Sequence, residues 1–288
     1  MYIALVRRFM SVLLSLTALI YGNAATANPV PSVADGATAR IVTFNVRCTG
    51  TGKTSVAYRA PLLCAQLRAT DADSIGLQEA NLRWMTVLCD RLDGYDYVGV
   101  ARANGKNLGE FSPIFYKKDK YTVRDSGTFW LSKTPDKPGT KDWGSQNIRI
   151  CTWVILENKE TGEAYAHFNT HLDHISGTAR AMQMDVLLDK IAVYAEGLPV
   201  VLTGDFNDES GSAMYEKATA VLRDSRLLAP VTEDKATFHN YGGLVLMDKI
   251  DFIFVSESVT PLVYHVIDDR IGGDYLSDHY GIYTDVSF

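Results

Sequence analysis

Cysteine is scarce in this chain of 288 residues, which contains only four. None lies in a Cys-x-x-Cys pair, and their spacing is not that of a zinc site, so thiolate metal chemistry is not indicated. Cys64 and Cys89 fall on the apolar faces of two consecutive predicted helices. The sequence leaves open whether these two form a disulfide or stay as buried thiols.

Positive charge is also in short supply. The chain has 28 lysines and arginines against 34 aspartates and glutamates, and its formal net charge is −6. No basic stripe interrupts this acidic balance. An acidic protein has no general electrostatic attraction to nucleic acid, which argues against strong binding of a polymer. A nucleic-acid substrate held by a few local charges stays open.

Long apolar runs are missing beyond the N-terminal segment. There, Arg7 and Arg8 precede the apolar stretch Phe9–Tyr21, and Ala25-Thr26-Ala27 has the small residues of a cleavage site. The stretch is short for a membrane span of about 20 residues, which argues against an uncleaved anchor. We therefore expect residues 1–27 to be a signal peptide. The mature protein, without these two arginines, would be secreted or periplasmic, carry a net charge of −8 and have no stable membrane association.

The rest of the chain has the pattern of one domain. Residues 28–39 are small and polar and are expected to be a tether, and residues 40–288 the domain. Short β-rich runs are predicted at 41–46, 74–78, 95–100, 113–116, 150–156, 165–169, 199–203, 250–255 and 262–266. Helical periodicity is predicted at 56–69, 82–92, 176–195 and 212–222. This alternation favours an α/β fold of two packed sheets covered by helices.

Polar side chains recur at the ends of the apolar strands. Asn45, Glu79 and Asp205 each follow such a run, and Asp251 lies inside one. A charged group in a buried strand is costly unless it is paired or binds a metal. One such residue is usually a structural polar group, whereas several together indicate a site. Carboxylates, carboxamides and imidazoles without thiolates suit Mg²⁺, and also Mn²⁺ or Ca²⁺.

In order, these residues resemble the motif series of the endonuclease/exonuclease/phosphatase superfamily. The resemblance rests on Asn45, Leu77-Gln78-Glu79, Asn169-Thr170-His171-Leu172, Gly204-Asp205-Phe206-Asn207, Ile250-Asp251-Phe252-Ile253 and Ser277-Asp278-His279. It covers about residues 40–288 and includes features of a bacterial-type secreted branch. It implies a deoxyribonuclease I-like fold, which is a four-layer sandwich of two packed mixed β-sheets flanked by helices.

The resemblance also implies roles for the matching positions. Glu79 would be the main metal ligand, with Asn45 and Asp278 assisting. Asp205 would orient or deprotonate the attacking water, and Asn207 would hold that water and a phosphate oxygen. His279 would contact the phosphate, and Asp251 would bond to the His279 ring. His171 would bind the phosphate from the other side.

Four further residues are candidates with less specific signals. Glu110 and Arg149 match the secreted deoxyribonuclease pattern, in which Glu110 would pair with His171 and Arg149 would contact the phosphate; the alternative for each is a surface ion pair. His174 and Arg180 could contact a second phosphate or a leaving group. The alternative for this pair is a structural network beside the site.

These features predict a metal-dependent phosphoric ester hydrolase. The leading hypothesis is hydrolysis of phosphodiesters, in nucleic acid or a smaller molecule, by in-line attack of an activated water. A phosphomonoesterase, such as an inositol phosphatase, or a sphingomyelinase-like lipid-headgroup phosphodiesterase is the alternative enzyme. A non-catalytic binding module on the same fold is the alternative of another class. We expect a monomer whose partner is a phosphate-ester substrate.

Overall fold

The computed structural model describes residues 27–268 and 270–288. The predicted signal peptide therefore lies outside the described residues except for Ala27. The predicted tether lies against the domain: the guanidinium of Arg40 donates hydrogen bonds to the carbonyls of Pro31 (2.9 Å) and Ser32 (3.0 Å). The backbone N–H of Ala34 donates to Asp285 (2.9 Å).

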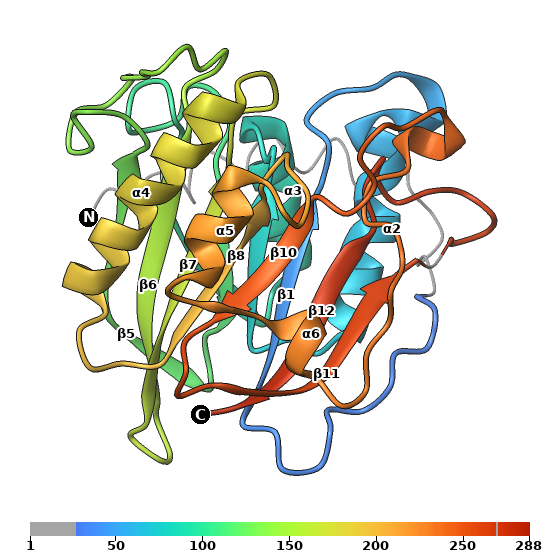
Figure 1. Ribbon diagram of the computed structural model, residues 1–288. Helices are drawn as coiled ribbons and strands as arrows, with labels where there is room; N and C mark the ends of the chain where they lie inside the picture. Colours follow the sequence, from blue (N-terminus) through green and yellow to red (C-terminus); the bar gives the residue numbers. More distant parts are fainter. Residues whose placement is uncertain (1–26, 269) are drawn as a thin grey trace.

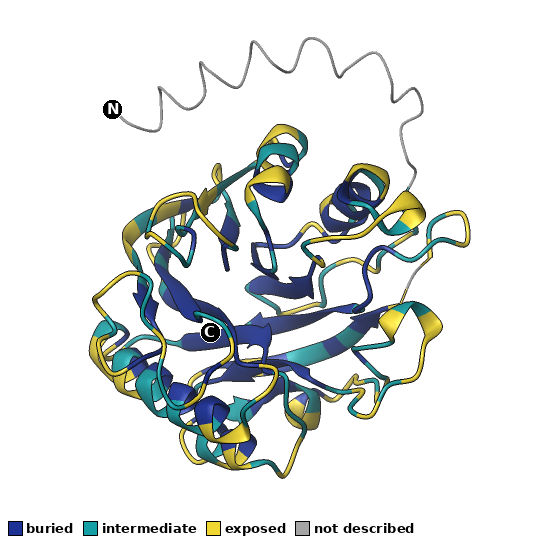
Figure 2. Cartoon of the chain, turned by 90° about the horizontal axis from the view of Figure 1, so that it is seen from above, coloured by how far each residue is buried: buried dark blue, intermediate teal, exposed yellow. Residues whose placement is uncertain are grey.

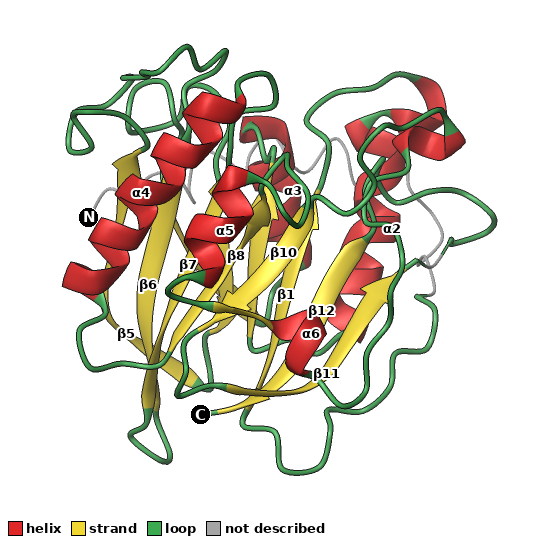
Figure 3. Ribbon diagram, viewed as in Figure 1, coloured by secondary structure: helices red, strands yellow, loops and turns green. Residues whose placement is uncertain are grey.

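The described residues form two six-stranded sheets (Figures 1 and 3). The first has the order β11 (Thr260–Ile267), β12 (Gly281–Ser287), β1 (Ala39–Asn45), β2 (Ser74–Gln78), β4 (Ile114–Lys117), β3 (Tyr95–Val98). The second has the order β5 (Tyr121–Trp130), β6 (Ile150–Asn158), β7 (Ala164–His171), β8 (Val200–Asp205), β10 (Asp251–Val255), β9 (Arg223–Asp224). Both sheets are mixed, because β1–β2 and β7–β8 pair in parallel and the other pairs are antiparallel.

Helices cover the outer face of each sheet. On the first sheet these are α2 (Val56–Ala69) and α3 (Leu82–Arg91), and on the second α4 (Gly177–Tyr194) and α5 (Ala213–Thr219). The shorter elements are η1 (Gly52–Thr54), α6 (Ser225–Leu228) and η2 (Asn240–Gly242). Seen from above, the strands form the buried middle of the molecule, with helices on both sides (Figure 2). The expected four-layer sandwich is confirmed.

Side-chain alternation along the strands explains the layering. In β1, Val42 and Phe44 pack in the cluster that contains α2 and α3, whereas Ile41 packs in the core between the two sheets. Since successive residues of a strand face opposite sides, one apolar strand supplies both layers. Ser55 and Ser176 cap α2 and α4 by accepting hydrogen bonds from backbone N–H groups of the first turn.

Polar residues also bridge the two sheets. The hydroxyl of Tyr165 donates to Ser74 Oγ (3.0 Å), which lies 2.8 Å from Nδ1 of His167. Nε2 of His167 lies 2.9 Å from Thr203 Oγ1, which donates to Oδ1 of Asn169 (3.0 Å). This chain of bonds fits a neutral imidazole with its proton on Nε2. It connects β2 of the first sheet to β7 and β8 of the second, and so holds the two sheets together.

Cys64 and Cys89 remain thiols, as do Cys48 and Cys151. Cys64 is buried, whereas Cys89 is exposed. The sequence left a disulfide or two buried thiols as alternatives for this pair, and within the described chain no disulfide joins them. Among the same residues, no helix combines the length and apolar character needed to cross a membrane.

Candidate active site at the edge of the two sheets

The predicted site residues meet at one edge of the sandwich because of the strand directions. Parallel strands β1 and β2 end together at Asn45 and Gln78, and β7 and β8 end together at His171 and Asp205. Strand β10 runs antiparallel to β8, with Asp251 opposite Asp205. Each chain segment therefore delivers its polar terminal residue to the same place.

Asn45 links the two sheets at this edge. Its Nδ2 donates hydrogen bonds to Asp205 Oδ2 (2.8 Å) and to Glu79 Oε1 (3.2 Å). The other Glu79 oxygen accepts from the backbone N–H of Cys48 (2.9 Å). Glu79 has a φ of 61°, a left-handed conformation that is uncommon for a side chain of this kind and that turns the carboxylate out of the strand direction.

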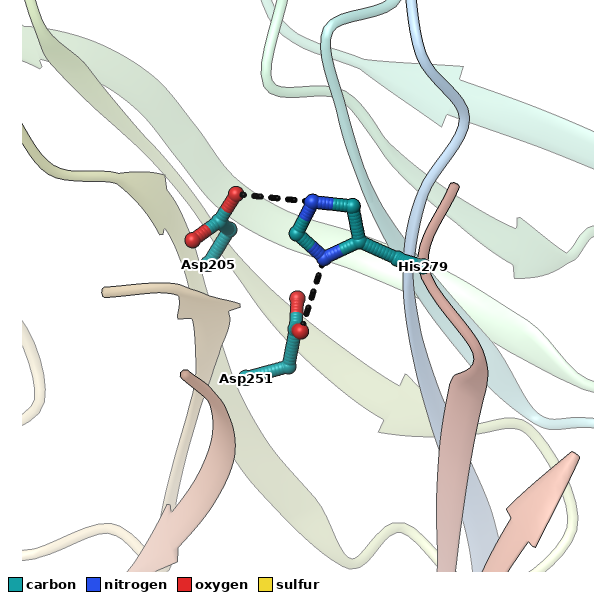
Figure 4. Close-up of side chains that lie close together, drawn as sticks. All are labelled: Asp205, Asp251 and His279. Carbon is teal, nitrogen blue, oxygen red and sulfur yellow. Dashed lines mark hydrogen bonds and ion pairs between the residues drawn. The ribbon is translucent and has the colours of Figure 1, made fainter. Parts of the chain in front are cut away.

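His279 lies between two aspartates (Figure 4). Its Nδ1 is 2.9 Å from Asp251 Oδ2, and its Nε2 is 3.7 Å from Asp205 Oδ2. His171 approaches the same oxygen of Asp205 from the other side, with its Nε2 at 3.5 Å. The two imidazoles predicted to contact the phosphate thus approach the same carboxylate oxygen of Asp205.

The pKa values of His279 and Asp205 are both raised, and this gives the two residues different protonation states near neutral pH. Burial alone would lower the pKa of His279, but Asp251 and Asp205 outweigh it and raise the value to about 10. Burial, and then the negative charge of Asp251, raise the pKa of Asp205 to about 7. Near neutral pH the imidazole is therefore a cation that can donate hydrogen bonds, and Asp205 is poised to accept a proton.

Asn207 is held in position by its backbone as well as its side chain. Its φ is 52°, and its N–H donates to Asp205 Oδ1 (3.0 Å). Its Nδ2 donates to the carbonyl of Leu172 (3.0 Å), which leaves the amide oxygen for other partners. A non-glycine residue in the left-handed region at this point fixes both Asp205 and Asn207 relative to β7.

Two sets of side chains could hold a divalent cation. One is the predicted set of Asn45, Glu79 and Asp278, which offers only oxygen donors. The other is Asp205, Asp251 and His279, whose donor atoms lie within 4.8 Å of one another. We favour the first, because Nδ1 of His279 is already bonded to Asp251 and a protonated imidazole does not bind a metal. An acid- and amide-only set suits Mg²⁺ or Mn²⁺, so the residues present fit such an ion.

One predicted pair is not made. Between the two described side chains Glu110 and His171 there is no hydrogen bond; Glu110 instead forms a bidentate ion pair with Arg102, at 2.8 and 3.0 Å. Burial, followed by the positive charges of Arg149 and Arg102, holds the pKa of His171 well below its usual range. The expected pairing of Glu110 with His171 is therefore wrong for this structure, because the guanidinium of Arg102 binds the carboxylate instead.

Arg149 is nearly fully buried at the start of β6. Its Nη2 lies 3.2 Å from Nδ1 of His174, and its Nε has no hydrogen-bond partner within the described chain. Arg149, His171, Arg102 and Glu110 all line one small pocket next to the catalytic cluster. The structure thus places Arg149 and His174 at the site.

Arg180 has a different environment. Its Nε donates to Asp208 Oδ2 (2.7 Å), and its Nη1 donates to the carbonyl of Asp173 (3.1 Å). Asp173 in turn accepts backbone N–H groups of Ile175 and Ser176. These contacts match the alternative of a structural network that shapes the loop before α4.

The sequence interpretation missed two arginines at this edge. Arg102 lies in a turn-rich loop that begins after β3, and the backbone bond from its N–H to the Glu110 carbonyl (2.9 Å) brings the two residues together. Arg47 follows Asn45 with a φ of 53°, and its Nε lies 3.4 Å from Asp278. The Gly105 and Gly109 pair was the available signal of a tight loop near Glu110.

This architecture, with acids, amides and imidazoles at one edge of a two-sheet sandwich, defines a class of phosphoester hydrolases. The model of the endonuclease/exonuclease/phosphatase family matches residues 42–279, and the chain belongs to this family. Members of the family include nucleases and phosphatases.

Solved structures support the same assignment. An endonuclease/exonuclease/phosphatase from Bacteroides vulgatus is 34% identical, with a TM-score of 0.83 over 87% of this chain and 98% of that chain. A mannosyl-6-phosphatase from Bacteroides thetaiotaomicron is 32% identical, with a TM-score of 0.81 over 87% of this chain and 100% of that chain.

Curated relatives are more distant. The CCR4-Not complex 3'-5'-exoribonuclease subunit Ccr4 of Aspergillus niger is 25% identical over 206 residues, which are 55% of this chain. The match spans 31% of that protein's length, so the chain corresponds to about a third of the curated relative.

Proposed function

We propose that the protein hydrolyses phosphate esters by in-line attack of water, with a divalent cation, Mg²⁺ by preference, as cofactor. The observation that carries the proposal is the position of Asp205. Its carboxylate contacts Asn45 on the metal side and lies between the imidazoles of His171 and His279. A base at this point is next to every group that would hold the phosphate.

Each residue then has a task that its contacts support. Asp205 accepts the proton of the attacking water, because its raised pKa brings it near neutral pH. His279, kept cationic by Asp251, donates a hydrogen bond from Nε2 to a phosphoryl oxygen whose negative charge grows in the transition state. The side-chain oxygen of Asn207 orients the water.

Asn45, Glu79 and Asp278 would hold the cation. When bound, a divalent ion stabilises negative charge on the phosphate and the leaving oxygen. The nearly full burial of the Asp278 carboxylate, which is 2% exposed, supports a bound positive charge here.

The ester type has two candidates. The sequence favours a phosphodiester, in nucleic acid or a smaller molecule. A phosphomonoester is the second candidate, because the Bacteroides thetaiotaomicron relative acts on a mannosyl 6-phosphate and because two arginines line a small pocket beside His171. The acidic net charge of −6 also argues against a long polyanion.

We further propose a secreted or periplasmic, monomeric protein without stable membrane association. The basic and apolar N-terminal residues and the small residues before Asn28 support export.

A substrate panel tests the function. Purified residues 28–288 would be assayed with Mg²⁺ and Mn²⁺ on plasmid DNA, RNA, bis-p-nitrophenyl phosphate, p-nitrophenyl phosphate, sugar 6-phosphates, inositol phosphates and sphingomyelin. We expect turnover of at least one ester, loss of activity on chelation and return with Mg²⁺. Full activity in excess chelator would refute metal dependence, and no turnover of any ester would refute the hydrolase proposal.

A further inference from the structure

The ion pair between Arg102 and Glu110 borders the catalytic cluster. Both side chains line the same small pocket as Arg149 and His171. Both terminal nitrogens of the Arg102 guanidinium bind the Glu110 carboxylate, with N–O distances of 2.8 and 3.0 Å. On the facing wall, however, two buried polar atoms, Nε of Arg149 and Nδ1 of His171, have no hydrogen-bond partner in the part of the chain that the structure describes.

The charges in this pocket do not cancel. Two guanidinium groups, Arg102 and Arg149, face one carboxylate, Glu110. Arg149 is 3% exposed, and within the described residues its guanidinium bonds to the ring of His174. Burial, followed by the like charge of Arg102, lowers the pKa of Arg149 to about 10. A buried cation without a carboxylate partner is costly, and its cost is recovered when an anion binds beside it.

We propose that Arg102 is a second substrate-binding arginine that selects phosphate monoesters, and that it exchanges Glu110 for a phosphate oxygen when substrate binds. The inference rests on the proposed phosphoesterase function and names its substrate class. Arg149 and Arg102 together form the positive wall of the pocket.

The number of free phosphate oxygens explains the selectivity. A diester has two nonbridging oxygens and one negative charge, and the cation side and His279 use both. A monoester has a third nonbridging oxygen and, near neutral pH, a second charge. That third oxygen enters the pocket beside Arg149, where the N–H donors and positive charge of Arg102 match it.

The exchange has a second consequence for His171. Once Arg102 turns to the phosphate, Glu110 is left in the same pocket as Nδ1 of His171. Nδ1 then takes up a proton from solvent and donates a hydrogen bond to Glu110, which fixes the orientation of the His171 ring when a monoester is bound. Arg102 thereby couples substrate binding to the state of the imidazole.

Histidine side-chain NMR tests the exchange without turnover. Ring ¹⁵N spectra of the Mg²⁺-loaded protein would be recorded with and without inorganic phosphate, with His171 assigned from a His171→Gln variant. We expect Nδ1 of His171 to gain a proton when phosphate saturates the wild type. In Arg102→Ala the proton should be present already without phosphate, since Glu110 is released. An Nδ1 unchanged by saturating phosphate in the wild type would overturn the exchange.

Kinetics test the selectivity. In Arg102→Ala we expect KM for a monoester to rise about 10- to 100-fold, the effect of losing a charge-assisted hydrogen bond, while KM for a diester, which has no third oxygen for Arg102, changes less than about threefold. Arg102→Lys keeps the positive charge but lacks the planar guanidinium, so its KM for a monoester should lie between those of the wild type and Arg102→Ala. Arg226→Ala is the matched control: Arg226 is 18% exposed against 17% for Arg102, and its ion pair to Asp234 measures 2.9 Å.

The outcomes separate this inference from the proposed function. Equal losses on both ester types, or no loss on either, would refute monoester selection while hydrolysis stands. Turnover of diesters alone would also refute monoester selection without refuting hydrolysis. If no ester is hydrolysed but phosphate still binds in an Arg102-dependent way, the hydrolase proposal fails and the anion pocket stands.

Discussion

At the scale of single residues, Asp205 is the group on which the chemistry depends. Asp205→Asn preserves the shape of the side chain and, through its amide oxygen, one of the two hydrogen bonds that Asp205 accepts from Asn45 and Asn207, but an amide cannot accept a proton from water. We expect kcat to fall by a factor of about 10²–10⁴ on the best substrate of the panel. Melting temperature and circular dichroism should stay close to those of the wild type.

Asp185→Asn is the control for this variant, because Asp185 is an α4 carboxylate whose partner is Lys217 (2.6 Å), away from the site. It should retain wild-type kcat. Wild-type activity in Asp205→Asn would remove Asp205 from the mechanism and leave His171 or Glu79 as the candidate base.

Most of the catalytic cluster could be predicted from sequence, and the arginine pairing could not. Asn45, Asp205 and Asp251 stand at strand ends, where a polar residue after an apolar run is itself a signal. Arg102 has no such signal, since a turn-rich loop outside any strand or helix brings it to Glu110. Which of Arg102 and His171 holds Glu110 depends on a competition between side chains in three dimensions, and no local pattern encodes that result.

At the scale of elements, the contact between β2 and the opposite sheet is close enough to require glycine. A Cβ at Gly76 would lie 2.4 Å from Thr203 Oγ1 and 2.6 Å from Asn169 Oδ1. Gly76→Ala should therefore push the sheets apart and lower the free energy of unfolding by about 1–3 kcal/mol. Urea denaturation monitored by tryptophan fluorescence would measure it.

Gly94→Ala is the matched control, because a Cβ there would have no atom within 4 Å. It should change stability by less than about 0.5 kcal/mol. Equal stability of Gly76→Ala and the wild type would mean that the sheets are not packed as closely as described.

Element boundaries followed from sequence where burial was strong. The predicted helix 56–69 coincides with α2, and the helix predicted at 176–195 differs from α4 by one residue at each end. Strand β5 was missed because it lies at a sheet edge, and half of its residues, including Arg124, Asp125 and Ser126, are polar or exposed. Its pattern is set by pairing with β6 rather than by an apolar core face.

At the scale of the whole molecule, His167 ties the two sheets together and makes their association sensitive to acid. Burial lowers the pKa of His167 from 6.5 to about 3. Between these two pH values, His167 is protonated in the unfolded chain and neutral in the folded one. The stability from this residue is complete above about pH 6.5 and is lost as the pH falls toward 3.

The loss should reach the order of 2–3 kcal/mol by pH 4.5, as determined by urea denaturation at several pH values. His167→Gln should be less stable than the wild type at pH 7.5, because the bonds to Ser74 and Thr203 are weakened. Its stability should fall less steeply over the same pH range. Parallel curves for the two proteins would show that another group causes the acid sensitivity.

The central claim is that side chains from both sheets form one hydrolytic centre in which the cation lies on the side of Asn45, Glu79 and Asp278. Anomalous diffraction from a crystal soaked in Mn²⁺ tests it most directly. The account predicts a single strong peak bordered by Glu79, Asn45 and Asp278, with the hydrogen bond between His279 and Asp251 intact. A peak among Asp205, Asp251 and His279, or no peak at this edge at all, would contradict it.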